Sequence, residues 1–221
     1  MPSAAEVHVW WAGTYQLTQA HRELLDPVER ARWTRLQRAD DRDRFTLGSA
    51  VVRCLVAELD GTEPTQVALD RACPRCGEQH GPVTAPGRRW HCSVSHSGGL
   101  ALAAAVAASE ASAVGIDVET RCPPDWADLV PDLLARGERA PDDGAAFLGL
   151  WVRKEAVLKA TREGLSRSMA TVDVTGSESD NLRIVDLDVG SLGSAGRAGT
   201  VAAAVAVGAQ RVRLHWQQAR I

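Results

Sequence analysis

Two pairs of charged side chains have the types and spacing of a site for phosphate chemistry. Asp117 and Glu119 alternate with apolar residues in V-G-I-D-V-E, so on a strand both carboxylates face the same side. Adjacent carboxylates repel each other unless a cation lies between them, and Mg²⁺ prefers such ligands together with phosphate oxygens. Glu155 and Lys159 lie four apart in W-V-R-K-E-A-V-L-K, so on a helix they share one face. These segments predict carboxylates and an ammonium group that act on a phosphorylated ligand.

Each pair also has an ordinary structural interpretation. The sequence has 25 Lys and Arg residues, but its only lysines are Lys154 and Lys159, on either side of Glu155. An i,i+4 pair on a helix surface contributes only about 0.2–0.5 kcal/mol to stability and implies no site. The carboxylates of the strand could likewise face solvent, with Arg121 as their partner.

A third polar motif, S-H-S-G-G, covers residues 95–99. Ser95 and His96 carry hydrogen-bonding side chains, and the two glycines allow backbone N–H groups to come close to a ligand. The alternative is that His96 only satisfies a turn.

Arginines could supply further phosphate contacts, because the guanidinium fork matches phosphate oxygens. Acidic residues are interleaved with these arginines, which is equally typical of a solvated, salt-bridged surface. Arg30, Arg32 and Arg35 are the arginines whose spacing best places their side chains near one side of the helix. The two helices expected in residues 21–59 carry eight arginines: Arg22, Arg30, Arg32, Arg35, Arg38, Arg42, Arg44 and Arg53.

The segment C-P-R-C-G-E-Q-H contains half of a zinc site, in Cys73, Cys76 and His80. A fourth ligand could come from His91 or Cys92 if the loop folds back, and the alternative is a cysteine knuckle without metal. Five cysteines without an apparent export signal favour reduced thiols.

The composition is that of an ordinary globular protein, with 221 residues, 45% hydrophobic residues and a net charge of −3. This charge argues against a general nucleic-acid-binding surface. The longest apolar stretch, residues 100–108, is too short to cross a bilayer, and the N-terminal residues do not resemble a signal peptide. We therefore expect a cytoplasmic protein that binds neither nucleic acid nor membrane.

Hydrophobic periodicity predicts an α+β protein. We expect helices over residues 21–36, 40–59, 125–136 and 145–161. We expect strands at 7–11, 93–95, 100–108, 114–118, 170–174, 182–187, 201–207 and 212–216. Residues 100–108 and 114–118 are expected to pair as a hairpin, although the alanines of the first favour a helix by propensity. Residues 60–92 should be irregular, and 190–199 should form a Gly/Ser turn.

The expected elements repeat in the order strand, two helices, strands. This order predicts two α+β halves, residues 1–110 and 111–221. We place nucleotide and phosphate contacts in the first half, and metal and catalytic residues in the second.

Taken together, the motifs resemble a known family. G-I-D-V-E followed by W-V-R-K-E-A-V-L-K is similar to the paired signature of the 4′-phosphopantetheinyl transferases, and S-V-S-H-S-G-G resembles the third motif of the larger, Sfp-type members. Motif order, spacing and chain length agree, so the resemblance covers most of the chain. It implies a pseudo-twofold α+β fold with the active site between the halves.

The resemblance also implies a reaction. The 4′-phosphopantetheine arm of coenzyme A would be transferred to a serine of an apo acyl or peptidyl carrier protein, with Mg²⁺ (or Mn²⁺) as cofactor and adenosine 3′,5′-bisphosphate as the released product. Alternatives are another Mg²⁺-dependent diphosphate phosphotransferase or phosphohydrolase, and a non-catalytic zinc-knuckle module.

Several residue roles follow from the resemblance. Asp117, Glu119 and Glu155 would bind the metal, and Glu155 would accept the proton of the carrier serine. Lys159 would neutralise the diphosphate, and Ser95 and His96 would contact the nucleotide. Further coenzyme A contacts are expected from the N-terminal half, namely Arg32, Arg44, Arg53, His80 and Gly81.

One departure concerns a Gly-Lys-Pro loop that many relatives carry. The corresponding match here is His80-Gly81-Pro82, without a lysine, so the basic role would fall to Arg88 or Arg89 or be absent. The partner is expected to be an acidic carrier protein of a polyketide, nonribosomal peptide or fatty-acid synthase, steered by the arginine-rich helices. Two halves in one chain make a monomer sufficient.

Overall fold

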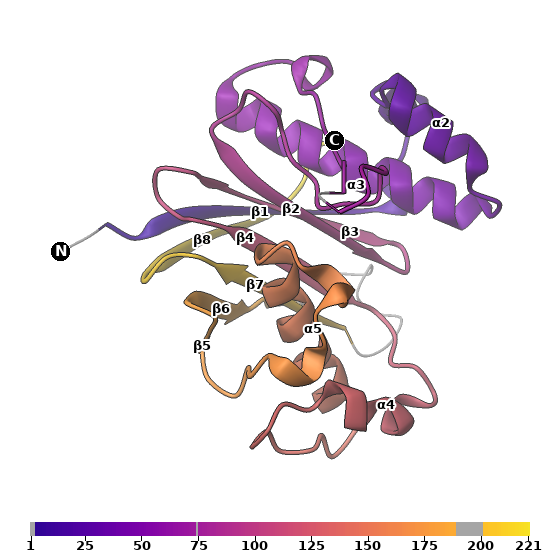
Figure 1. Cartoon of the computed structure of the whole chain (residues 1–221). Coiled ribbons are helices and arrows are strands. Elements are labelled where there is room, and N and C mark those ends of the chain that lie inside the picture. Colours follow the sequence, from indigo (N-terminus) through magenta and orange to yellow (C-terminus); the bar gives the residue numbers. More distant parts are fainter. Residues whose placement is uncertain (1–2, 74, 189–200) are drawn as a thin grey trace.

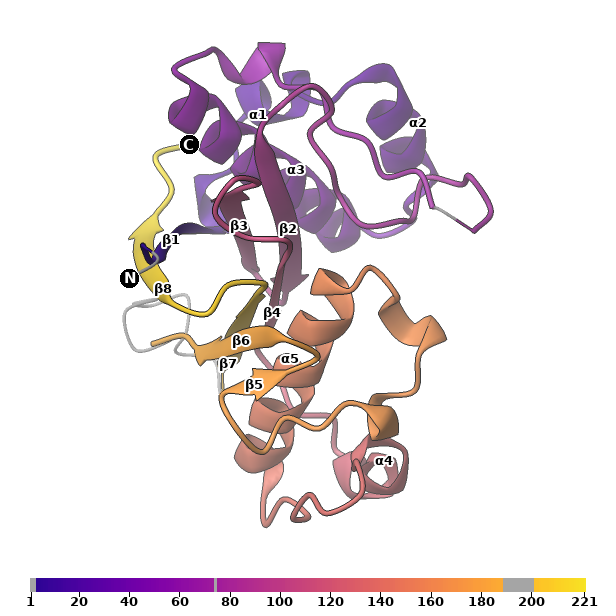
Figure 2. The ribbon, with the colours of Figure 1, turned by 60° about the vertical axis from the view of Figure 1, so that its left-hand side comes forward.

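The protein is described here by a computed structural model, in which residues 3–73, 75–188 and 201–221 are placed. Two four-stranded sheets form its centre, with strand orders β2-β3-β1-β8 and β4-β7-β6-β5 (Figure 1). Helices cover the outer face of each sheet, and the polypeptide divides into an upper and a lower half in a second view (Figure 2). The α+β class and the two-part architecture are therefore confirmed.

The first sheet contains β1 (Ala5–Gly13), β2 (Trp90–Ser97), β3 (Leu100–Ala107) and β8 (Val212–Gln218). β3 pairs antiparallel with both β1 and β2, whereas β8 runs parallel to β1. The alanine-rich segment is thus a strand, as predicted. Alternate residues of β3 belong to two different hydrophobic cores. Ala101, Ala103 and Ala105 pack against the helix over residues 39–60. Leu102 and Val106 face the second sheet.

Three helices belong to the first half: α1 (Gln19–Glu23), α2 (Pro27–Arg35) and α3 (Ala39–Asp60). The single helix expected over 21–36 is wrong, because Asp26 caps a new helix at Pro27 by accepting the backbone N–H of Glu29. Helix α3 begins at Ala39, one residue before the predicted start, and the side chain of Arg38 ahead of it makes no cap hydrogen bond. It ends at Gly61, whose φ of 65° suits a glycine.

The second sheet contains β4 (Val114–Glu119), β5 (Glu178–Ser179), β6 (Leu182–Asp186) and β7 (Ala202–Val207). Helix α5 (Gly144–Ala160) packs on it, and α4 (Trp126–Leu133) lies beyond α5. Gly115 permits the close approach of α5, because a Cβ at this position would lie 2.0 Å from the carbonyl oxygen of Ala156.

Two further predictions are wrong, one of a strand pairing and one of a strand. β3 and β4 are both strands, but β4 pairs with β7 instead of forming a hairpin with β3. Residues 170–174 contain a 3₁₀ turn in place of a strand, and Lys154 Nζ donates to the carbonyls of Met169 and Val172 there. The expected Gly/Ser turn at 190–199 lies outside the described residues. The described part of the chain also contains four 3₁₀ turns: Thr14–Gln16, Pro64–Gln66, Gly164–Ser166 and Met169–Thr171.

The last strand joins the sheet of the first half, since β8 pairs with β1. The division into residues 1–110 and 111–221 remains a prediction. It does not match the sheets at β8, which lies within 111–221 but belongs to the sheet of the first half. Among the described helices, none combines the length and apolarity needed to cross a membrane.

Candidate active site

A row of serines on β2 links the two sheets. Strands β2 and β4 belong to different sheets, but Ser93, Ser95 and Ser97 alternate along β2 and so face the same side. Ser93 Oγ accepts the backbone N–H of Ile116 at 3.1 Å. Ser97 Oγ accepts the backbone N–H of Thr120 at 3.1 Å. Side chains of one strand thus replace the missing backbone ladder to the other.

The same row positions the two carboxylates of β4. Ser95 Oγ donates to Asp117 Oδ1 at 2.6 Å, and Ser97 Oγ donates to Glu119 Oε2 at 2.7 Å. Both acids lie on one face of β4, as the alternation predicted. Ser97 was not among the predicted site residues, although its i+2 spacing from Ser95 is a signal that could have identified it.

Lys159 reaches across from α5 to Asp117. Its Nζ lies 2.5 Å from Asp117 Oδ1 and donates to Ser95 Oγ at 3.0 Å. No ion pair between Lys159 and Glu155 is formed in the described structure, so the interpretation as an i,i+4 surface pair is wrong. Lys154, the other lysine, is fully buried and pairs with Glu138 at 2.6 Å, which makes its role structural.

The second oxygen of Asp117 is the clearest sign of a missing ligand. Asp117 is 3% exposed, and its Oδ2 is buried without a hydrogen-bond partner among the described residues. Leaving a buried charged acceptor unsatisfied costs more than an ordinary hydrogen bond contributes. A cation bound at this oxygen would remove that cost.

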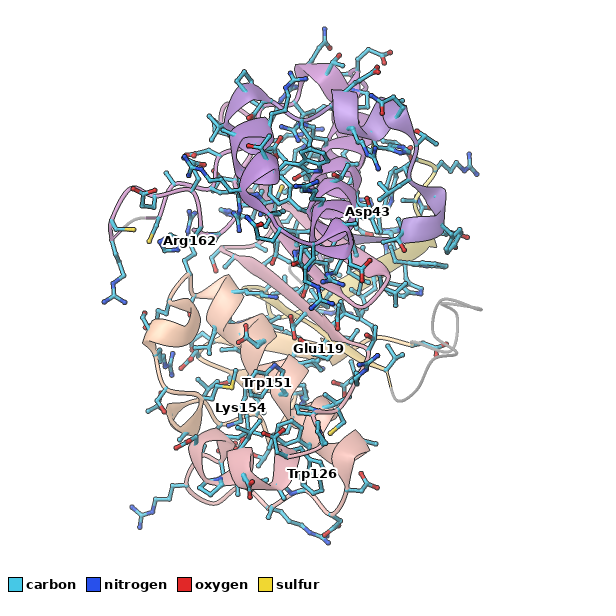
Figure 3. All side chains as sticks on the ribbon, turned by 90° about the vertical axis from the view of Figure 1, so that its right-hand side faces the viewer. Asp43, Glu119, Trp126, Trp151, Lys154 and Arg162 are labelled. Carbon is cyan, nitrogen blue, oxygen red and sulfur yellow. The ribbon has the colours of Figure 1, made fainter. Side chains whose placement is uncertain are left out.

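These groups surround a cavity of about 320 Å³. Figure 3 shows Glu119 at the level where the two halves meet, with Lys154 and Trp126 farther into the lower half. Seven predicted site residues line the cavity: Arg32, Ser95, His96, Asp117, Glu119, Glu155 and Lys159. Five further residues complete its wall: Phe45, Gly48, Arg71, Val94 and Trp151.

The electrostatics of the cavity favour a bound cation. Burial raises the pKa of Glu155, and repulsion from Asp117 and Glu119 raises it further, against the opposing effect of Lys159. Burial also raises the pKa of Glu119, although the hydrogen bond from Ser97 opposes this shift. Lys159, Arg32 and Arg71 line the same cavity, so its formal charges balance, but the three carboxylates repel one another and a cation among them would relieve that repulsion.

The three carboxylates do not form a preassembled ligand set for a metal ion. Among the described residues, the oxygens of Asp117, Glu119 and Glu155 do not form a set that lies entirely within 4.8 Å. Mg²⁺ binds oxygens at about 2.1 Å in an octahedron, so all three carboxylates could reach one such ion only after side-chain movement. The unpaired Asp117 Oδ2 supplies a ready ligand.

Arg71 is the functional candidate that the sequence did not reveal. It lines the 320 Å³ cavity, and its Nε is buried without a partner among the described residues. Burial lowers its pKa to about 10, so the guanidinium stays charged at neutral pH. Arg71 belongs to an irregular segment without periodicity, where no pattern indicates side-chain direction.

Arg32 approaches the same cavity from helix α2. Its Nη1 donates to the carbonyl of Gln79 at 2.6 Å, and its guanidinium lies 5.2 Å from the ring centroid of Phe45. His96 also lines the cavity. Partial desolvation lowers the pKa of His96, and Lys159, Arg71 and Arg44 add electrostatic repulsion of its charged form.

Two predicted arginines lie elsewhere. Arg53 is 2% exposed and pairs with Glu29 at 2.7 Å and Asp26 at 3.3 Å, so it joins α2 to α3 and does not line the cavity. Arg44 pairs with Asp41 and donates to the carbonyl of Gly98 at 3.4 Å, just past the end of β2, and does not line the cavity.

His80 and Gly81 line an adjoining cavity of about 480 Å³, which shares Arg71, Glu155 and Lys159 with the first. Gly81 lies against backbone, because a Cβ there would be 2.7 Å from the carbonyl oxygen of Ala72. The two arginines considered as replacements for a loop lysine are in neither cavity. Arg88 pairs with Asp60 at 3.1 Å, and Arg89 lies over the ring of Trp90.

Comparisons with known proteins agree with this site. The 4′-phosphopantetheinyl transferase HetI of Nostoc sp. strain PCC 7120 is 31% identical over 176 residues, which cover 73% of this chain and 71% of HetI. Protein slr0495 of Synechocystis sp. strain PCC 6803, whose name assigns it the same activity provisionally, is 28% identical over 74% of this chain and 68% of its own length. A model of the 4′-phosphopantetheinyl transferase superfamily matches residues 113–205, which contain the acids of β4 and the Glu155/Lys159 helix. This chain therefore belongs to the 4′-phosphopantetheinyl transferase family and is a transferase.

Proposed function

We propose that this transferase moves the 4′-phosphopantetheine arm of coenzyme A to a serine of an apo carrier protein in a Mg²⁺-dependent reaction that releases adenosine 3′,5′-bisphosphate. The observation that carries the proposal is the convergence of Asp117, Glu119, Glu155 and Lys159 on one cavity, with Arg32 and Arg71 in its wall. This set pairs carboxylates for a metal with cations for a diphosphate.

The residues that would hold the metal are Asp117, Glu119 and Glu155. When bound, Mg²⁺ neutralises charge that builds on the phosphoryl oxygens and on the leaving bisphosphate. Asp117 Oδ2 is the carboxylate oxygen of this cavity that is buried without a partner among the described residues.

Glu155 is the proposed base. In the reaction the serine oxygen forms a bond to the β-phosphorus of coenzyme A while the bond to the oxygen of the leaving bisphosphate breaks. The serine proton passes to a carboxylate oxygen of Glu155. Burial raises the pKa of this carboxyl, which makes it a stronger base than a solvated glutamate once it is ionised.

Lys159 and the two arginines are the proposed phosphate contacts. The Lys159 ammonium carries three donors, and Asp117 and Ser95 use two of them, so one remains for a phosphate oxygen. Arg71 has an unused buried Nε among the described contacts. Ser95 orients both Asp117 and Lys159, which makes it a positioning residue as well as a candidate ligand contact.

The expected partner is an acidic carrier protein. Helix α2 exposes Arg30 and Arg35, and its exposed Val28 adds an apolar contact beside them. A local basic surface of this kind can steer an acidic partner although the whole chain has a net charge of −3. All residues of the cavity come from one chain, so a monomer is sufficient for the reaction.

The test is a transfer assay with an apo acyl carrier protein, coenzyme A and Mg²⁺, read by mass spectrometry of the carrier. The carrier should gain one phosphopantetheine group, and a chelator should stop the gain until Mg²⁺ or Mn²⁺ is supplied in excess. Glu155→Gln should reduce the rate by at least about 10²-fold, while Glu58→Gln, an exposed change on α3, should not. Cleavage of coenzyme A without modification of any carrier tested would favour a phosphohydrolase instead.

A further inference from the structure

We propose that Cys73, Cys76 and His80 bind a zinc ion that stabilises the loop carrying Arg71 beside the cavity. The ligand atoms of these three residues all lie within 4.8 Å of one another, and Cys76 Sγ is 3.1 Å from His80 Nε2. In tetrahedral zinc sites, neighbouring sulfur and nitrogen ligands are about 3.6 Å apart and two sulfurs about 3.8 Å apart. The observed set therefore needs only small side-chain movements to enclose the ion.

The backbone around these ligands is already folded as a tight turn. The N–H of Gly77 donates to the carbonyl of Cys73 at 2.8 Å, and the N–H of Cys73 donates to the carbonyl of Glu78 at 2.8 Å. Gly77 has a φ of 78°, which favours glycine at this point. A C-x₂-C-G turn of this kind holds two thiols on the same side, as zinc knuckles require.

The ligand types distinguish this site from the carboxylate site. Thiolate and imidazole ligands select zinc, whereas the oxygens of Asp117 and Glu119 select Mg²⁺. His91 and Cys92, considered as a fourth ligand from the sequence, do not join the set. Among the described residues no other side chain does so, and we assign the fourth position to water.

Hydrogen bonds hold this loop, but buried apolar side chains do not. Residues 75–78 and 80 are exposed, and no buried apolar residue of the described cores comes from 73–81. A metal ion can supply folding free energy directly in such a segment. The proposed zinc would therefore stabilise this loop as buried apolar side chains stabilise other parts of the chain.

This loop contacts both arginines of the active-site cavity. The carbonyl of Gln79 accepts from Arg32 Nη1 at 2.6 Å, and Gln79 Oε1 accepts the backbone N–H of Arg71 at 3.3 Å. The N–H of Gly81 donates to the carbonyl of Arg71 at 2.7 Å. Loss of the zinc should therefore disturb the positions of Arg32 and Arg71 without touching the acids of β4.

The first experiment measures the metal itself. Protein purified without chelators should contain about one zinc per chain by elemental analysis, and a Cys73→Ser/Cys76→Ser double variant should lose nearly all of it. Cys122→Ser is the matched control, because this cysteine lies beside Gly144 and outside the set, and it should keep the zinc. Replacement by Co²⁺ should give a thiolate-to-cobalt charge-transfer band in the wild type and in Cys122→Ser only.

The second experiment tests the consequence. In the double variant, hydrogen exchange should accelerate in residues 71–81 and remain unchanged in α5, and the KM for coenzyme A should rise at least about tenfold with little change in kcat. Zinc-free wild type with free thiols and no cobalt band would overturn the site. Bound zinc with unchanged exchange in the double variant would overturn its stabilising role. The metal and exchange readouts do not depend on transfer activity, so they stand apart from a failure of the proposed function.

Discussion

At the scale of single residues, the two carboxylate oxygens of Asp117 have different surroundings. Oδ1 accepts from Ser95 and Lys159, whereas Oδ2 is buried and unpaired among the described residues. The ammonium of Lys159 therefore partly neutralises a carboxylate that also has room for a metal ion.

Lys159→Met should leave Asp117 with an uncompensated buried charge. We expect the metal-free variant to lose about 1.5–3 kcal/mol of unfolding free energy, the usual contribution of hydrogen bonds to charged groups. Because Mg²⁺ can replace the missing cation, its addition should raise the melting temperature of the variant more than that of the wild type. Thermal unfolding with and without Mg²⁺ measures this, and equal shifts in both proteins would contradict the placement of the ion at Asp117.

Arg71→Ala should weaken coenzyme A binding. A lost charge-assisted hydrogen bond of about 1.5–3 kcal/mol corresponds to roughly a 10- to 150-fold weaker Kd. Isothermal titration with coenzyme A measures the change. Arg35→Ala, an exposed change on α2, should leave this Kd within about twofold and serves as the control. An Arg71→Ala variant with wild-type affinity would remove this residue from the site.

His21 makes the fold sensitive to acid. It is buried, and its Nδ1 accepts the backbone N–H of Thr18 at 2.9 Å. Burial lowers its pKa below the ordinary value of 6.5, so the unfolded chain takes up a proton first as the pH falls through about 6.5. The unfolding free energy should therefore fall below that pH, and this contribution should be absent above it.

His21→Gln should reduce this pH dependence. Urea unfolding at about pH 7.5 and about pH 5.5 gives the change for each protein, and up to about 1 kcal/mol of it should disappear in the variant. The raised pKa values of Glu119 and Glu155 are present in both proteins and cancel in the comparison. A variant that destabilises between the two pH values as much as the wild type does would refute the assignment to His21.

The sequence predicted which way a side chain points where the periodicity of a strand or helix determines that direction. The i+2 spacing of Asp117 and Glu119 and the helix face of Glu155 and Lys159 brought all four to one cavity. Of the three predicted arginines only Arg32 lines the cavity, because the partners of a long side chain are set by tertiary contacts. Arg53 is drawn into a buried ion pair with Glu29, and no local pattern encodes that contact.

At the scale of elements, helix α5 positions Glu155 and Lys159 through its close packing on β4. Gly115 makes this packing possible, because α5 crosses the strand where a side chain would collide with the backbone of Ala156 and Ala160. The length and type of α5 were predictable from its pattern, but the contact with Gly115 depends on which strand lies beneath it.

Gly115→Ala should therefore displace α5. The new Cβ would lie 2.0 Å from a backbone carbonyl, so the helix must move and the protein should lose about 1–3 kcal/mol of stability. A shift of about 1 Å at Glu155 and Lys159 should lower transfer by about 10²-fold.

Gly149→Ala is the matched control on the same helix. Nothing lies within 4 Å of a Cβ at this position, so alanine should raise stability by about 0.5–1 kcal/mol and leave transfer unchanged. Denaturant unfolding and the carrier assay measure both variants. Wild-type activity in Gly115→Ala would show that the position of α5 is not critical.

At the scale of the whole molecule, the two sheets meet along β2 and β4 without a backbone ladder between them. The serines of β2 supply the hydrogen bonds instead, and two of them also hold the acids of the site. The join between the halves and the placement of these acids are thus made by the same side chains. The sequence predicted two α+β parts, but not that the S-V-S-H-S motif joins them. Side-chain contacts between strands of different sheets produce no periodic pattern in the sequence.

Ser93 separates the two roles, since its hydroxyl accepts the N–H of Ile116 and contacts no acid. Ser93→Ala would leave this buried N–H unpaired and should cost about 1–3 kcal/mol of unfolding free energy. Ser49→Ala is the control, because Ser49 Oγ is buried on α3 with no hydrogen-bond partner among the described residues, and its removal should cost nothing. Urea unfolding compares the two.

Activity should distinguish the serines further. Ser95→Ala removes the donor to Asp117 and a partner of Lys159, so it should lower transfer more than Ser93→Ala does at a temperature where both variants stay folded. If both sheets depend on the serines as described, Ser93→Ala should also speed hydrogen exchange at Ile116 while β1 and β3 keep their protection. Unchanged exchange at Ile116 would mean that the hydrogen bond from Ile116 to Ser93 does not help to hold the two sheets together.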